Sequence, residues 1–76
     1  MNKPISQFTV GERGKVTAVN GEGKIRRRLF DMGVTAGVEF TMRKKAPLGD
    51  PIEITLRGYE LTLRKSEAAC AEAEVL

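Results

Sequence analysis

Apolar and polar residues alternate with a period of two in two stretches of this sequence, and that alternation restricts the possible fold more than any other feature. Val38, Phe40 and Met42 share one side of the first stretch, and Ile52 begins a second that runs to residue 63. Successive side chains of a β-strand point to opposite faces, so both stretches predict strands that are buried on one face. A turn-rich break, residues 46–51 (APLGDP), separates them. The chain is therefore expected to be mainly β.

The second stretch predicts a β-hairpin with Gly58-Tyr59 as its two-residue turn, because glycine in first place supplies the positive φ that such a turn requires. This register places residues of matching chemistry opposite one another. The expected pairs are Arg57 with Glu60, Thr55 with Thr62, Glu53 with Arg64, Leu56 with Leu61, and Ile54 with Leu63. Each such pair stabilises a sheet by ~0.2–1 kcal/mol relative to an alanine pair.

Two short helices are also predicted. Ile25, Leu29 and Met32 recur at the spacing of one helical face, and Gly33 is placed to end that helix in the left-handed conformation. A second helix is expected to begin with Ser66 as its N-cap and to carry Glu67 in its first turn.

The remaining strands are less regular. Residues 15–19 read as a strand, with a weaker alternation of Phe8 and Val10 ahead of it, and residues 73–75 return as a closing strand. Four to five short strands and two small helices, joined by glycine turns, predict a single domain over residues 1–76, folded as a small closed β-barrel. Closure would remove the exposed edges of so small a sheet.

The composition argues against an enzyme. The chain has 76 residues, no histidine and one cysteine, Cys70. A domain of this size buries only about 60% of its unfolded surface, which leaves little room for a substrate cleft. Histidine is the usual general base and the commonest transition-metal ligand. Gly23-Lys24 is followed by Ile25 and has no glycine at position 18, so it is not a phosphate-binding loop. We predict no catalytic activity, no metal site and no cofactor.

The sequence also predicts a cytoplasmic protein. A lone cysteine fits a reducing compartment, and Cys70 is expected to be a packing residue within an alanine-rich helix. The longest run without a charged residue is 4–11, far short of the roughly 20 residues that a membrane helix needs. The first residues lack the apolar segment of a secretory signal. No direct membrane insertion is expected.

The net charge of +3 leaves several partners open: nucleic acid, an anionic membrane surface or an acidic protein face, with simple solubility as the alternative. Proteins that bind single-stranded nucleic acid usually add aromatic platforms for stacking bases. Phe40 belongs to the apolar face, and only Tyr59 looks free to stack. Nucleic-acid binding is therefore kept as an alternative and not expected. Asp31 is interpreted as trimming a helix end, and Asp50 as forming a turn.

Four segments together resemble one family. They are residues 29–34 (LFDMGV), 36–37 (AG), 46–52 (APLGDPI), and 61–65 (LTLRK) followed by Glu67-Ala68. In this order and spacing they are similar to FeoA-type proteins of bacterial ferrous iron uptake, and the likeness runs from about Ile5 to Val75. Cys70, Ala71 and Ala73 are smaller than the aliphatic residues usual in the family, so the closing strand is expected to pack loosely or end differently.

The resemblance implies an SH3-like small barrel. It also implies a cytoplasmic accessory protein, at the inner face of the membrane through its partner, that binds and modulates the ferrous iron transporter FeoB, whose cytosolic part is a GTPase. The barrel also resembles the C-terminal accessory domain of some iron-dependent repressors. The chain has no room for their helix-turn-helix domain, so a stand-alone module is favoured over a transcription-regulator accessory module.

Two surfaces are the candidate partner-binding sites. The first is the basic helix face with Arg26, Arg27 and Arg28, which would steer docking onto an acidic partner. The second is the loop formed by Pro47, Leu48, Gly49 and Asp50, expected to project from the barrel rim, where binding residues are common. The alternative for the loop is a turn that serves geometry alone. Oligomeric state, the effect on the partner's GTPase and any contact with iron stay open.

Overall fold

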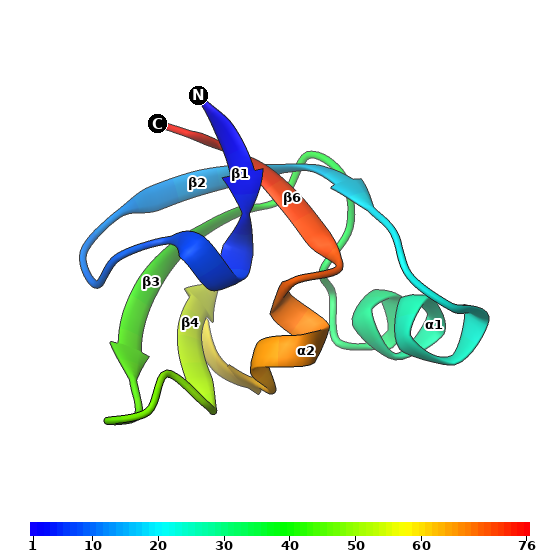
Figure 1. Ribbon diagram of the computed structural model, residues 1–76. Helices are drawn as coiled ribbons and strands as arrows, with labels where there is room; N and C mark the ends of the chain where they lie inside the picture. Colours follow the sequence, from blue (N-terminus) through cyan, green and yellow to red (C-terminus); the bar gives the residue numbers. More distant parts are fainter.

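Six antiparallel strands form one bent sheet in the order β1-β6-β2-β3-β4-β5 (Figure 1). The structure, a computed structural model, describes residues 1–76. Its elements are β1 (Asn2–Pro4), the 3-10 helix η1 (Ile5–Gln7), β2 (Arg13–Val19), α1 (Gly23–Asp31), β3 (Glu39–Lys45), β4 (Ile52–Leu56), β5 (Tyr59–Leu63), α2 (Lys65–Ala68) and β6 (Ala71–Val75). The mainly β prediction is confirmed. The strand that the sequence did not predict is β1, which is too short to show alternation.

The barrel closes differently from the prediction. β1 and β5 are the edges of the sheet and do not pair with each other. Helix α2 instead contacts η1, so helical turns bridge the gap between the two edges. Figure 1 shows β1, β6 and β2 on one side of this bend, β3 and β4 on the other, and α1 standing outside at one end.

The core fills the inside of the bend. Fifteen buried apolar residues form it: Ile5, Phe8, Val16, Leu29, Val34, Val38, Phe40, Met42, Ile52, Ile54, Leu56, Leu63, Ala68, Ala71 and Ala73. The alternating residues of β3 and β4 supply its centre, as predicted. The rings of Phe8 and Phe40 pack with their centroids 5.0 Å apart. Gly14 allows this packing, because a Cβ at that position would lie 2.6 Å from the Phe8 ring.

The β4–β5 hairpin forms, but its predicted turn and register are wrong. The turn is Arg57-Gly58, and both residues have positive φ, 50° and 82°. A two-residue turn with positive φ at both positions matches the twist of the flanking strands. Ile54 therefore pairs with Leu61, and Ile52 with Leu63. The pairing moved by an even number of residues, so every side chain keeps its predicted face.

The charge pairs expected across the hairpin are replaced by contacts with a third strand. Arg43 on β3 places its Nε 3.4 Å from a Glu53 carboxylate oxygen and 3.0 Å from one of Glu60. The Arg43 guanidinium thus forms ion pairs with one carboxylate on β4 and one on β5. This arrangement does not depend on direct pairing of Arg57 with Glu60 or of Arg64 with Glu53.

Helix α1 ends as predicted. Gly33 follows the helix with φ +91°, its N–H donates to the Phe30 carbonyl at 3.0 Å, and the Val34 N–H donates to the Leu29 carbonyl at 2.9 Å. These two bonds satisfy carbonyls that the end of a helix leaves free. Leu29 is fully buried and anchors the helix to the barrel.

The regions near both termini correct several predictions. Neither Phe8 nor Val10 belongs to a strand. Phe8 directly follows η1 and is buried, and Val10 lies in a turn and is exposed. Ser66 lies inside α2, and Arg64 is its N-cap. The Arg64 N–H donates to Glu67 Oε1 at 2.9 Å, which confirms Glu67 in the first turn. Cys70 follows the helix, half-buried, and its Sγ donates to the Ser66 carbonyl.

The closing strand β6 is longer and better packed than expected. It pairs with β1 on one side and β2 on the other. Ala71 and Ala73 are fully buried, so their small side chains allow close packing at this position. The expected looseness is not found. No helix of the structure is both long enough and apolar enough to cross a bilayer.

Candidate functional site

The three predicted arginines of α1 have different surroundings, because successive residues of a helix point about 100° apart. The Arg26 guanidinium lies over the Phe30 ring, 5.4 Å from its centroid. Arg28 forms an ion pair through its Nε with Glu67 of α2. Arg27 forms no ion pair and is exposed. Arg26 and Arg27 therefore both keep an unneutralised charge, and of the three Arg27 is the one without a contact that fixes its side chain.

Arg28 connects α1 to α2 and does more than present charge. Its side chain is 60% exposed, whereas that of Glu67 is only 9% exposed. Glu67 is the one buried charged residue of the chain, and its carboxylate receives both the Arg64 N–H and Arg28. The sequence prediction missed this role of Glu67. Its place three residues after the N-cap could have indicated the capping bond, but not the partner on α1.

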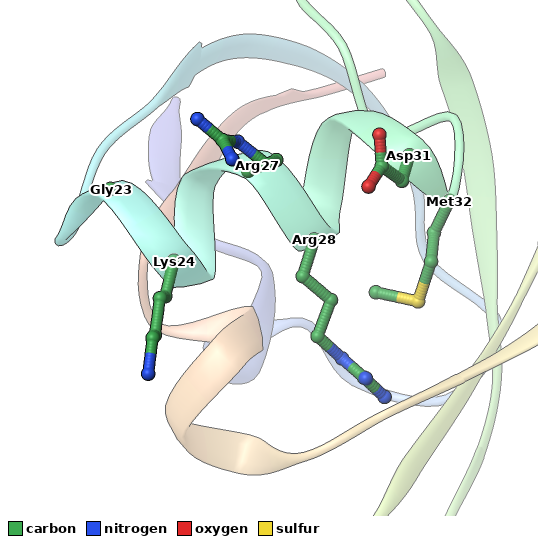
Figure 2. Close-up of a pocket in the computed structure, with 6 residues that line it drawn as sticks. All are labelled: Gly23, Lys24, Arg27, Arg28, Asp31 and Met32. Atoms are coloured by element: carbon green, nitrogen blue, oxygen red, sulfur yellow. The ribbon is translucent and has the colours of Figure 1, made fainter.

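An open hollow on α1 gathers several of these charges. It is lined by Gly23, Lys24, Arg27, Arg28, Asp31 and Met32 (Figure 2). Lys24 and Arg28 point towards α2, and Arg27 projects from another side of the helix. Three cations and one carboxylate give the hollow a positive charge, and Met32 is its one apolar side chain. Such a surface attracts an acidic partner and offers no enclosed space for a substrate.

The Pro47–Asp50 loop projects from the molecule, as predicted, and is held by backbone hydrogen bonds. The Gly49 N–H donates to the Ala46 carbonyl at 2.7 Å, and the Ala46 N–H donates to the Pro51 carbonyl at 3.0 Å. Leu48, at the end of this turn, is 91% exposed.

Asp50 ties this loop to α2. Its Oδ1 accepts the backbone N–H of Lys65 at 2.9 Å, and the Asp50-Pro51 peptide bond is cis. The Asp50 side chain therefore joins the loop to α2, a contact that the sequence did not predict. Figure 1 places the loop between β3 and β4 at one end of the molecule and α1 at the other, so the fold does not bring the two predicted surfaces together.

Tyr59 is exposed, as the sequence predicted, but its hydroxyl has a structural partner. Its hydroxyl donates to the Met32 carbonyl at 2.7 Å, which ties β5 to the end of α1. A Cβ on Gly33 would lie 2.7 Å from the same hydroxyl oxygen.

The one carboxyl with a strongly shifted pKa lies outside both surfaces. The Thr9 backbone N–H and, second, the Lys3 ammonium lower the pKa of Glu12 to about 2. The two contacts measure 2.7 Å and 2.9 Å, and they fix the loop ahead of β2. No three histidine, cysteine or acidic side chains are grouped so that they could hold a metal ion.

Known proteins with similar sequences and structures support the family resemblance. The FeoA domain family matches residues 3–75. A FeoA-like protein from Clostridium acetobutylicum is 43% identical, with a TM-score of 0.91 over 99% of this chain and 87% of that one. Stenotrophomonas maltophilia FeoA complexed with zinc, described as a procaryotic SH3 domain protein and a possible ferrous iron transport activating factor, is 25% identical, with a TM-score of 0.78 over 93% of this chain and 88% of that one.

A curated relative from Porphyromonas gingivalis joins two proteins in one polypeptide. It is an Fe(2+) transport protein A/Fe(2+) transporter FeoB fusion protein, 32% identical over 72 residues, which cover 95% of this chain and 8% of the fusion protein. A manganese-dependent transcriptional repressor shares the fold alone, at 13% identity and a TM-score of 0.92 over 99% of this chain and 37% of that one. The SH3-like fold is thereby confirmed, and the chain belongs to the FeoA family.

Proposed function

We propose that this protein is an accessory and regulatory protein of bacterial ferrous iron uptake that binds and modulates a FeoB-type transporter at the cytoplasmic face of the membrane. The observation that carries the proposal is the relative in which a chain of this family is fused to FeoB. A covalent link keeps two modules at high effective concentration, which is an advantage for modules that contact one another. Residues 1–76 would act as a single contact module, with iron transport and GTP hydrolysis carried out by the partner.

The α1 face supports the proposal at residue level. Arg27 and Lys24 are exposed and form no ion pairs, and arginine is enriched in protein–protein interfaces. Arg28 and Tyr59 connect α1 to α2 and β5, so a partner that contacts the helix also contacts a surface fixed to the barrel. Charges of this kind mainly raise the association rate with an acidic partner.

The test is a calorimetric titration of the protein against the cytosolic part of its FeoB, with GTP hydrolysis measured in parallel. We expect saturable binding and a changed hydrolysis rate. Arg27→Glu should weaken binding, with the loss greatest at low salt. Lys15→Glu is the matched control, since Lys15 is an exposed cation on β2. If no heat is released at high micromolar concentration and hydrolysis is unchanged, the proposal fails.

A further inference from the structure

The end of the molecule opposite α1 has a different composition from the arginine face. Leu48 is the most exposed large apolar side chain of the chain. Four basic residues lie on the segments next to this loop or bonded to it, and together with Leu48 they are called the Leu48 end: Lys44 and Lys45 at the end of β3, and Arg64 and Lys65 at the start of α2. Lys44 and Lys45 finish β3 directly before the loop, and the Lys65 N–H is bonded to Asp50 of the loop.

The position of Leu48 is fixed by the surrounding backbone. The turn that carries it is closed at both Gly49 and Ala46, and Asp50 joins it to α2. Single exposed leucines are common on protein surfaces and need no explanation. This one stands at the tip of a loop held at three points, so an apolar contact made by Leu48 would cost little additional ordering.

The charges around Leu48 are positive and largely available. Lys44, Arg64 and Lys65 are exposed and form no ion pair. The Lys45 ammonium donates to the Ser6 carbonyl at 3.1 Å, a contact that leaves its charge unneutralised. Asp50 is the one carboxylate within the loop, and Glu53 at the start of β4 pairs with Arg43. The Leu48 end is therefore net positive.

This combination fits a lipid surface better than a protein. Lysine is depleted in protein interfaces, whose centres are built from clustered aromatic and apolar anchors. The Leu48 end has three lysines to one arginine, and Leu48 is its single large apolar side chain, with Pro47 beside it. A lysine stem can lie along an apolar surface while its ammonium stays in water among the headgroups. Basic residues beside one inserting apolar side chain are suited to anionic phospholipids.

We propose that the Leu48 end is a peripheral docking site for an anionic phospholipid bilayer, with Leu48 entering the interface and the exposed cations Lys44, Arg64 and Lys65 contacting lipid phosphates. The contact goes beyond the proposed function, because it needs no transporter. It also departs from the expectation of no direct membrane insertion, because one side chain would enter the bilayer surface. A protein bound to lipid through the Leu48 end would present α1 on the side away from the bilayer (Figure 1).

The test is flotation of the protein with vesicles of phosphatidylcholine alone or mixed equally with phosphatidylglycerol, at about 50 mM and about 500 mM salt. We expect binding to the anionic vesicles at low salt and its loss at high salt. Leu48→Ser should lower the vesicle partition coefficient roughly tenfold, and Lys44→Gln roughly fivefold. Leu76→Ser and Lys15→Gln repeat the same chemistry away from this end and should leave the partition coefficient unchanged.

A second measurement reports the side chain directly. The sequence contains no tryptophan, so Leu48→Trp introduces a single fluorophore whose emission should shift to the blue on the anionic vesicles. Absence of flotation at low salt, or equal partition of the wild type and Leu48→Ser, would overturn the proposal. A blue shift produced by the cytosolic part of FeoB without vesicles, and not by vesicles, would assign this end to a protein instead. The vesicles contain no transporter, so a negative result leaves the FeoB titration unaffected.

Discussion

The contact between Arg28 and Glu67 allows a quantitative test of how α1 is held to the barrel. Glu67 receives the Arg64 N–H through one oxygen and Arg28 through the other. Three substitutions separate these contributions: Arg28→Ala removes the ion pair, Glu67→Ala removes both contacts, and Glu67→Gln keeps an oxygen for the N–H without the charge.

The expected magnitudes follow from exposure. The Arg28 side chain is 60% exposed, so solvent screens the ion pair and Arg28→Ala should lower the free energy of unfolding by ~0.5 kcal/mol. Glu67→Ala leaves a helix N-terminal N–H without its acceptor and should cost ~2 kcal/mol. That loss corresponds to a melting temperature lower by ~8–16 °C in a domain of this size. Glu67→Gln should fall between them, at ~1 kcal/mol.

Urea unfolding followed by circular dichroism of the wild type, the two alanine variants and the double variant gives the coupling free energy between the two residues. We expect ~0.5 kcal/mol, because removal of either partner already removes the ion pair. A coupling above ~2 kcal/mol would refute the argument that the pair is screened. A loss below ~0.5 kcal/mol for Glu67→Ala would refute the capping role.

Three further predictions concern the packing at Gly14, the hydrogen bond between Tyr59 and Met32, and stability in acid. Gly14→Ala should lower the free energy of unfolding by ~1–3 kcal/mol, because its Cβ would overlap the Phe8 ring. In urea unfolding, Phe8→Leu combined with Gly14→Ala should recover part of this loss. An unchanged urea midpoint for Gly14→Ala would contradict the predicted overlap. Tyr59→Phe should cost ~1 kcal/mol by thermal unfolding through loss of the bond to Met32, whereas a stabilised variant would show that the bond contributes nothing. The pKa of Glu12 is lowered from 4.5 to about 2 in the folded protein, so its contribution to stability is present above pH 4.5 and is lost as the pH falls towards 2. Urea midpoints between these pH values should fall less steeply for Glu12→Gln than for the wild type, and equal slopes would exclude Glu12 as the cause.

Sequence patterns predicted β3, β4 and β5 and their buried faces because alternation is a local property, whereas β1 is too short to show it. Ile54 and Leu63 are buried as expected, although neither pairs with its predicted partner. Registers that differ by an even number of residues bury the same side chains, so alternation alone could not choose between them. The choice depended on a positive φ at Arg57, a residue type in which this conformation is uncommon.

The candidate surfaces show the same division between local and distant information. The loop that presents Leu48 was predicted from its proline and glycine residues, which act over a few positions. The hydrogen bond from the Lys65 N–H to Asp50 and the ion pair between Arg28 and Glu67 join residues far apart in sequence. The pattern of a single sequence contains no signal for such pairs. It also could not predict that the two surfaces lie at opposite ends, because their positions depend on the topology of the sheet.

The two ends of the chain lie side by side, because β1 pairs with β6 and the Val75 N–H donates to the carbonyl of Met1. A polypeptide attached at either end would leave the domain from this same place, away from both α1 and the Leu48 loop (Figure 1). Adjacent termini of this kind let a domain be joined to another protein with little distortion. The fold could therefore be carried on a larger polypeptide, such as the fusion relative, while both of the proposed contact surfaces stay exposed.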